Sequence, residues 1–226
     1  AGKTASRMVA CLFLVGLVFG FQTIFAAGSE PSRKDLAVVI SELSSKGRWA
    51  EAIPVALRWV TASEATNGVA HTNTATALES LGQLYERTSA FTNAQQAYAR
   101  SLKIRTASLG LEHPESVACL HLLARVSGST GDWTKAKQLN EDCLKLREKL
   151  LGPDHPDTAK SAHNLGMAVQ RLGDNARAES LFRQSLTIVD KALGPDNRDA
   201  LYPLWNLASL LQRKRDYAQA QPLYER

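Results

Sequence analysis

The sequence lacks the patterns by which most enzymes are recognised. Its 226 residues contain no Gly-x-x-x-x-Gly-Lys phosphate loop, no Gly-x-Gly-x-x-Gly after a strand, no His-Glu-x-x-His and no Gly-x-Ser-x-Gly. No segment has the apolar alternation of a strand that would carry such a motif. We therefore expect neither enzymatic activity nor a bound cofactor in this chain.

Strong charge of one sign is also missing. The net charge is +5, and two of the basic residues, Lys3 and Arg7, lie in a segment that we expect to be removed. The remaining basic residues form no long run, whereas nucleic-acid binding calls for a concentrated basic patch. We therefore expect no nucleic-acid partner.

The five histidines do not form a convincing metal site. His113 and His155 occupy equivalent loop positions with His71 aligned to them, and His121 and His163 are equivalent on successive helices. Equivalent positions on stacked helices lie about 10 Å apart or more, but the ligands of one zinc ion all lie about 2 Å from it. We expect no metal, and we predict that the loop histidines cap helices.

Residues 1–28 differ from the rest of the chain. Lys3 and Arg7 precede an uncharged apolar run over residues 8–21, and the small residues Ala26, Ala27 and Gly28 follow. This pattern is typical of a secretory signal peptide, and the run is shorter than the roughly 20 residues that span a bilayer. We predict cleavage after Ala27 or Gly28 and export to a periplasmic or extracellular location. The alternative is an uncleaved membrane anchor over residues 8–25, the one part of the chain expected to contact a membrane.

Cysteine is scarce, with three residues in all. Cys11 lies in the N-terminal segment, which leaves Cys119 and Cys143. An oxidising compartment would permit a disulfide between them. Small residues in repeat cores more often serve packing, so we predict two free, buried thiols.

What the sequence does contain is a repeat. Leu151–Pro156 reads LGPDHP, and related segments stand 42 residues earlier and 42 residues later. Apolar spacing within each unit predicts two amphipathic helices, and a fixed period of this length indicates a stacked repeat protein. The first helices are predicted near residues 33–46, 75–88, 115–130, 157–172 and 199–214. The second helices are predicted near residues 49–66, 91–109, 133–151 and 175–193, with a truncated one from 217.

Several short motifs within the units match a known family. Asn164-Leu165-Gly166, Gly173-Asp174, Ala178-Glu179 and Phe182 resemble the tetratricopeptide repeat, and the LGPDHPDT loop with its 42-residue period resembles the kinesin-light-chain type common in bacterial proteins. The resemblance implies an all-α, right-handed superhelical solenoid of antiparallel helix pairs, with about five repeats. Residues 29–74 would form a degenerate capping repeat, and residues 75–226 regular repeats of which the last is cut off. Departures from the pattern are Thr72, Asn175 and Asn197-Arg198.

The sequence stops in the middle of a predicted helix at Arg226. We expect a piece of a longer protein. One alternative function is therefore the recognition arm of a multidomain protein, such as one with a C-terminal caspase-like peptidase domain. Another is an architectural spacer, or self-association through the open end at residues 217–226.

The resemblance directs particular positions of the first helices toward a concave groove. Arginine binds carboxylates bidentately, asparagine pairs with peptide backbone, and rigid aromatic side chains anchor interfaces. The predicted peptide-binding residues are His121, Arg125, Lys160, His163, Asn164, Arg171, Tyr202, Trp205, Asn206 and Arg213. The alternative is that they are ordinary solvated residues and that Trp205 packs on a following repeat. We expect a protein–protein interaction scaffold that binds an acidic or mixed-charge peptide segment of a protein partner.

Overall fold

The computed structural model describes residues 32–226, and within them it contains ten α-helices, one short 3-10 helix and no strand. The predicted all-α fold is confirmed. The expected signal peptide or anchor falls outside the described residues. None of the described helices is both long enough and apolar enough to cross a membrane.

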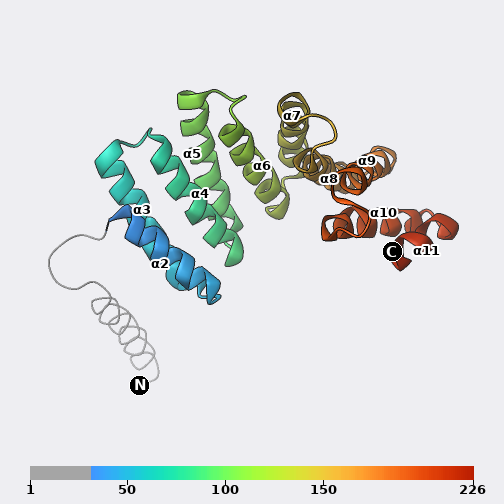
Figure 1. Ribbon diagram of the computed structural model, residues 1–226, viewed down its shortest axis with the longest axis horizontal. Helices are drawn as coiled ribbons and strands as arrows, with labels where there is room; N and C mark the ends of the chain where they lie inside the picture. Colours follow the sequence, from blue (N-terminus) through green and yellow to red (C-terminus); the bar gives the residue numbers. More distant parts are fainter. Residues whose placement is uncertain (1–31) are drawn as a thin grey trace, which may run out of the picture.

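The helices form five consecutive pairs (Figure 1). The first helices of the pairs are α2 (Arg33–Ser45), α4 (Thr72–Arg87), α6 (Pro114–Ser129), α8 (Pro156–Arg171) and α10 (Leu201–Arg213). The second helices are α3 (Trp49–Asn67), α5 (Phe91–Leu109), α7 (Trp133–Leu151), α9 (Asn175–Leu193) and α11 (Tyr217–Glu225). These bounds agree closely with those predicted from the period, apart from α4, which begins three residues early, and the start of the last pair.

The pairs stack into an arch (Figure 1). Each helix packs mainly on the helices before and after it in the sequence, and α8 also contacts α6 and α10. The first helices α4, α6 and α8 therefore line the concave side of the arch, while α5, α7 and α9 lie on its convex side (Figure 1). The concave surface is built mainly from the elements in which the binding residues were predicted.

The loop histidines cap the first helices, as predicted. His113 Nδ1 accepts a hydrogen bond from the Glu115 N–H at 3.2 Å, and His155 Nδ1 accepts one from the Asp157 N–H at 3.1 Å. Such a bond satisfies one of the helix N–H groups that lack a partner within the helix. Each loop is preceded by a glycine with φ near +90°, such as Gly152 at +93°, a conformation that side chains disfavour.

The last pair begins differently from the others. Residues 198–200 form a 3-10 turn, capped by Asn197, and α10 starts only at Leu201. Pro203 has no N–H to donate to the carbonyl of Asp199, so an α-helical turn cannot close there. The predicted first helix over residues 199–214 is thus partly wrong at its start.

Close helix crossings explain the glycines in the middle of the first helices. A Cβ atom added to Gly166 would lie 2.7 Å from the Phe182 ring, and one added to Gly82 would lie 2.5 Å from the Tyr98 ring. Both aromatic side chains are fully buried. The glycines thus allow α5 and α9 each to seat an aromatic ring directly on the backbone of the preceding helix.

Cys119 and Cys143 are free and buried. Cys143 Sγ lies 3.3 Å from Ser161 Oγ, and Cys119 Sγ lies 3.5 Å from the carbonyl oxygen of Tyr98. They act as small core residues in α6 and α7.

Candidate functional site

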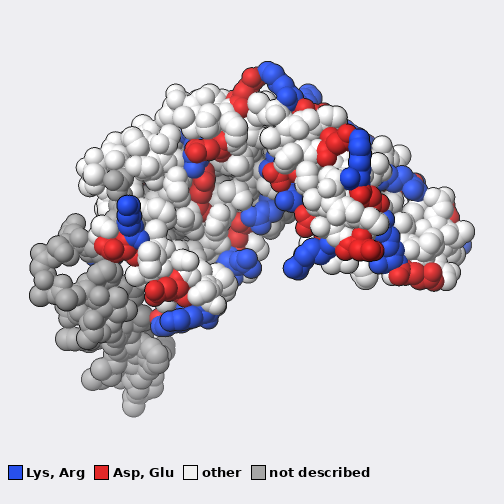
Figure 2. Space-filling model, viewed as in Figure 1, with Lys and Arg blue, Asp and Glu red and all other residues white. Residues whose placement is uncertain are grey.

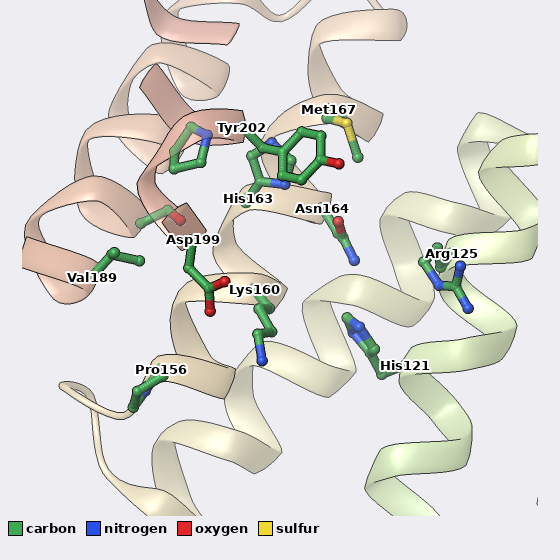
Figure 3. Close-up of a pocket in the computed structure, with 12 residues that line it drawn as sticks. His121, Arg125, Pro156, Lys160, His163, Asn164, Met167, Val189, Asp199 and Tyr202 are labelled. Carbon is green, nitrogen blue, oxygen red and sulfur yellow. The ribbon is translucent and has the colours of Figure 1, made fainter. Parts of the chain in front are cut away.

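A cavity of about 410 Å³ opens between α6, α8, α9 and the start of the last pair (Figure 3). Six of the ten predicted residues line it: His121, Arg125, Lys160, His163, Asn164 and Tyr202. The helix stacking therefore brings together residues from three repeats. Pro156, Met167, Val189 and Pro203 supply apolar wall, and Asp199 supplies a carboxylate.

His163 is held at the junction of α8 and α10. The Asn206 amide nitrogen, which can only donate, lies 2.8 Å from His163 Nε2, so this ring nitrogen accepts. The ring also lies 5.7 Å from the Phe182 ring and 6.3 Å from the Tyr202 ring, between centroids. Burial lowers the pKa of His163 from about 6.5 to about 4. The imidazole is therefore neutral at pH 7, and it presents hydrogen-bonding capacity without charge.

His121 lies in a region of excess positive charge. Its pKa is lowered from about 6.5 to about 3, chiefly by burial and also by the charges of Arg147, Arg125 and Lys160, while Asp157 acts in the opposite direction. Arg147 itself is buried, with Nη1 3.4 Å from His121 Nδ1. Three cations around one neutral ring make this end of the cavity favourable for an anionic group.

The two cations that face the cavity already pair with carboxylates of the chain. Arg125 donates to Glu86 at 2.7 Å, and Lys160 donates to Asp157 at 3.0 Å. Lys160 and Asp157 are both about half exposed, and such exposed ion pairs contribute only about 0–1 kcal/mol. Glu86 is nearly buried, so Arg125 must stay close to it. A ligand carboxylate can therefore displace Asp157 from Lys160 at small cost, and it can share Arg125 with Glu86.

Charged side chains of both signs are interspersed over this face of the arch (Figure 2). Lys and Arg groups gather where the hollow of the arch is deepest, but Asp and Glu groups lie beside them (Figure 2). The pattern matches a mixed-charge ligand better than a uniformly acidic one.

The other four predicted residues do not line the cavity. The Arg171 guanidinium stacks on the Trp133 ring at 5.2 Å, and Asn206 bonds to His163. Trp205 is 65% exposed and contacts the Tyr224 ring edge-on at 5.4 Å. Arg213 is exposed at the end of α10. The Arg171 side chain is thus occupied by a contact with Trp133 of α7. Trp205 packs partly on α11, and much of its indole remains open to solvent.

Six lining residues were not predicted: Pro156, Met167, Ser185, Val189, Asp199 and Pro203. Val189 lies on a second helix, whereas the predicted residues all lie on first helices. The sequence nevertheless holds a sign of it: the 42-residue step aligns Val189 with Arg147 and Arg105, so an apolar residue interrupts a series of cations.

Within residues 32–226 no group of three or more His, Cys, Asp or Glu side chains is arranged to hold a metal ion. The recurring histidines are instead accounted for by the capping bonds and by the cavity wall.

The fold and the cavity define a class of protein: a solenoid of helix pairs with a hollowed concave face. The tetratricopeptide repeat family matches residues 43–107, 90–149, 116–191 and 162–226. The chain therefore belongs to the tetratricopeptide repeat family. Members of this family are typically non-enzymatic scaffolds for protein–protein interactions.

Solved structures agree with this assignment. Kinesin light chain repeats of Podosopora anserina superpose with a TM-score of 0.75 at 24% identity, covering 88% of this chain and 94% of that one. BtubC of P. vanneervenii superposes with a TM-score of 0.74 at 17% identity, covering 85% of this chain and 76% of that one. A Rap protein complexed with competence and sporulation factor superposes with a TM-score of 0.69 at 16% identity, covering 85% of this chain and 52% of that one. No curated protein sequence matches the chain.

Proposed function

We propose that the chain is a non-enzymatic scaffold that binds an extended peptide segment of a protein partner on its concave side. The observation that carries the proposal is the cavity of about 410 Å³ in which side chains of three successive repeats converge. Ligand sites are concave and mostly apolar, with a few polar groups that fix orientation. This cavity has that composition.

The charge around His121 favours a carboxylate of the partner at that end of the cavity. Lys160 of α8 and Arg125 of α6 both line the cavity, on either side of His121 in Figure 3, and the buried Arg147 adds a positive charge beside His121. A carboxylate placed here gains charge-assisted hydrogen bonds, and Asn164 offers both a donor and an acceptor to the neighbouring peptide backbone.

A solved structure of the same fold contains a bound factor. The Rap protein was solved in complex with competence and sporulation factor, so that helix solenoid binds this factor. This chain spans about half of the Rap protein. The ligand proposed for this chain is therefore inferred from the residues that line its own cavity.

The scaffold would act outside the cytoplasm if residues 1–28 direct export. This proposal rests on the sequence pattern of two basic residues, a short apolar run and small residues at its end. Expression with residues 1–28 intact, followed by mass measurement of the exported protein, tests it. A mature N-terminus near residue 28 or 29 supports export, whereas a protein retained at full mass in the membrane supports the anchor instead.

Binding is tested by selecting peptides from a random display library on the purified protein. Lys160→Glu should weaken the selected peptides about 10- to 100-fold, since one hydrogen bond to a charged group contributes about 1.5–3 kcal/mol. Lys149→Glu is the matched control, because it breaks an exposed ion pair with Glu112 and Lys149 does not line the cavity. Equal weakening by both variants, or selected peptides without a carboxylate, would contradict the proposal.

A further inference from the structure

An arginine fills the junction between the second and third repeats. Arg105 of α5 is 5% exposed. Its Nε and Nη2 donate to Glu79 of α4 at 2.6 and 3.0 Å, Nη2 also donates to Thr76 at 3.2 Å, and Nη1 donates to Glu115 in the first turn of α6. Two carboxylates thus compensate one buried guanidinium, as a buried cation requires.

The next junction repeats the arrangement with Arg147, which stands 42 residues after Arg105. Arg147 is 7% exposed, and its Nη1 donates to the Asp157 carbonyl at 2.7 Å and to Ser161 at 3.0 Å, besides lying near His121. The guanidinium again lies between the first helix of its own repeat and the start of the next.

In the fourth repeat the equivalent residue is Val189. The residues around it keep the frame of the site: His163 stands where Glu79 and His121 stand, and Asp199 stands where Glu115 and Asp157 stand. Lys160 and Pro203 are equivalent to Thr76 and Ser161. All four line the cavity together with Val189. The cavity therefore includes the space that an arginine side chain fills in each of the two preceding repeats, and we call it the arginine slot.

The lining of the arginine slot retains part of the chemistry that holds the two internal arginines. Pro156, Val189 and Pro203 give an apolar channel that suits the methylene stem of a long cationic side chain. Asp199 lines the slot, is exposed to solvent and forms no ion pair within residues 32–226. His163 is neutral at pH 7, so it does not repel a cation, and Lys160 is already paired with Asp157.

We propose that the arginine slot receives an arginine side chain of the bound peptide, which pairs with Asp199 as Arg105 pairs with Glu115. The proposal rests on the proposed function and deepens it: the partner segment carries an arginine that enters beside Val189 and a carboxylate that faces Lys160. Charge complementarity selects arginine over an apolar side chain, since the exposed Asp199 carboxylate can pair with a guanidinium but makes no favourable contact with an apolar group.

The first test uses no peptide. Val189→Arg supplies the missing side chain from within the chain, so it should raise the urea midpoint of unfolding, and Asp199→Asn in the same protein should remove most of that rise. Val189→Leu, which fills space without charge, is the matched control and should gain less. The assignment of the cavity as an arginine slot is overturned if Val189→Arg lowers the midpoint, or if Asp199→Asn leaves the rise unchanged.

The second test measures recognition with three short probes, acetyl-Ala-Arg-Ala-amide and its norleucine and citrulline analogues, by NMR titration of the ¹⁵N-labelled protein. The arginine probe should bind at least about fivefold tighter than either analogue, shift the backbone amides near Val189 and Asp199, and lose these effects in Val189→Arg. Equal binding of the norleucine probe would make the slot an apolar site and overturn the proposal. The proposal would also be overturned if Val189→Arg stabilised the protein but the arginine probe did not bind, because the slot would then exist without recognising a ligand.

The peptide-display experiment and the probe titration together distinguish failure of the arginine slot from failure of the proposed function. If display-selected peptides depend on Lys160 but contain no arginine, the scaffold function stands and the arginine slot fails. If the arginine probe binds in the slot while no display peptide depends on Lys160, the carboxylate part of the proposed function fails instead.

Discussion

Acid should destabilise this protein through the two histidines of the cavity. The pKa of His121 is lowered to about 3 and that of His163 to about 4, from about 6.5 in the unfolded chain. A base whose pKa is lowered by folding binds its proton less readily in the folded state. The stability that depends on the neutral rings is therefore fully present above about pH 6.5 and decreases as the pH falls toward 4.

The magnitude follows from the width of that pH window. Between about pH 6.5 and pH 5 the unfolded state takes up a proton at each of the two sites, while the folded state does not. At 1.36 kcal/mol per pH unit, each histidine then costs about 2 kcal/mol, and the two together about 4 kcal/mol. For His163 the structural cause is its burial against Phe182, where protonation would also remove the bond from Asn206 to Nε2.

The assay is urea unfolding followed by circular dichroism at about pH 7.5 and about pH 5. His121→Gln and His163→Gln should each recover about half of the acid-induced loss, and the double variant most of it. The wild-type protein, which shares every carboxylate and capping histidine with the variants, is the reference. A double variant that loses as much stability as the wild type would refute the assignment of the loss to these rings.

Three further changes probe the fold. Gly166→Ala should destabilise the protein by about 1–3 kcal/mol through overpacking against Phe182; an unchanged urea midpoint would mean that the helices cross less closely. Arg105→Met should cost about 3–5 kcal/mol because it leaves Glu79 without its cation, and a thermal unfolding curve like the wild type's would disprove this. Gly152→Ala, at φ +93°, should cost about 1–3 kcal/mol, measured by the same denaturation.

Helix positions could be predicted from the sequence because they depend on local patterns. The predicted second helices over residues 91–109, 133–151 and 175–193 agree with α5, α7 and α9. Apolar spacing, the glycine after each of α3, α5, α7 and α9, and the histidine before each of α4, α6 and α8 all act within a few residues of one another. The exception is the start of α10, where Pro203 blocks an α-turn that the 42-residue step alone would predict.

The candidate site was predictable only in part. Equivalent positions on stacked first helices face the same side, so His121, Lys160 and His163 were predicted to share a surface, and they line one cavity. The partners of the arginines were not predictable in this way. Arg125 pairs with Glu86, and Arg171 stacks on Trp133, contacts between residues 39 and 38 positions apart that depend on how neighbouring repeats pack.

The sequence by itself determined that this chain is a stack of helix pairs, because a period of 42 residues with capping and apolar signals in each unit leaves one architecture that buries every apolar face. Only the tertiary structure decided which charges are compensated and where space remains. Arg105 and Arg147 are buried between repeats, whereas Val189 leaves a cavity at the same place. The physical reason is that a junction is formed by residues of two repeats at once, so a single substitution changes the volume and the charge of a site whose other walls lie far away in the sequence.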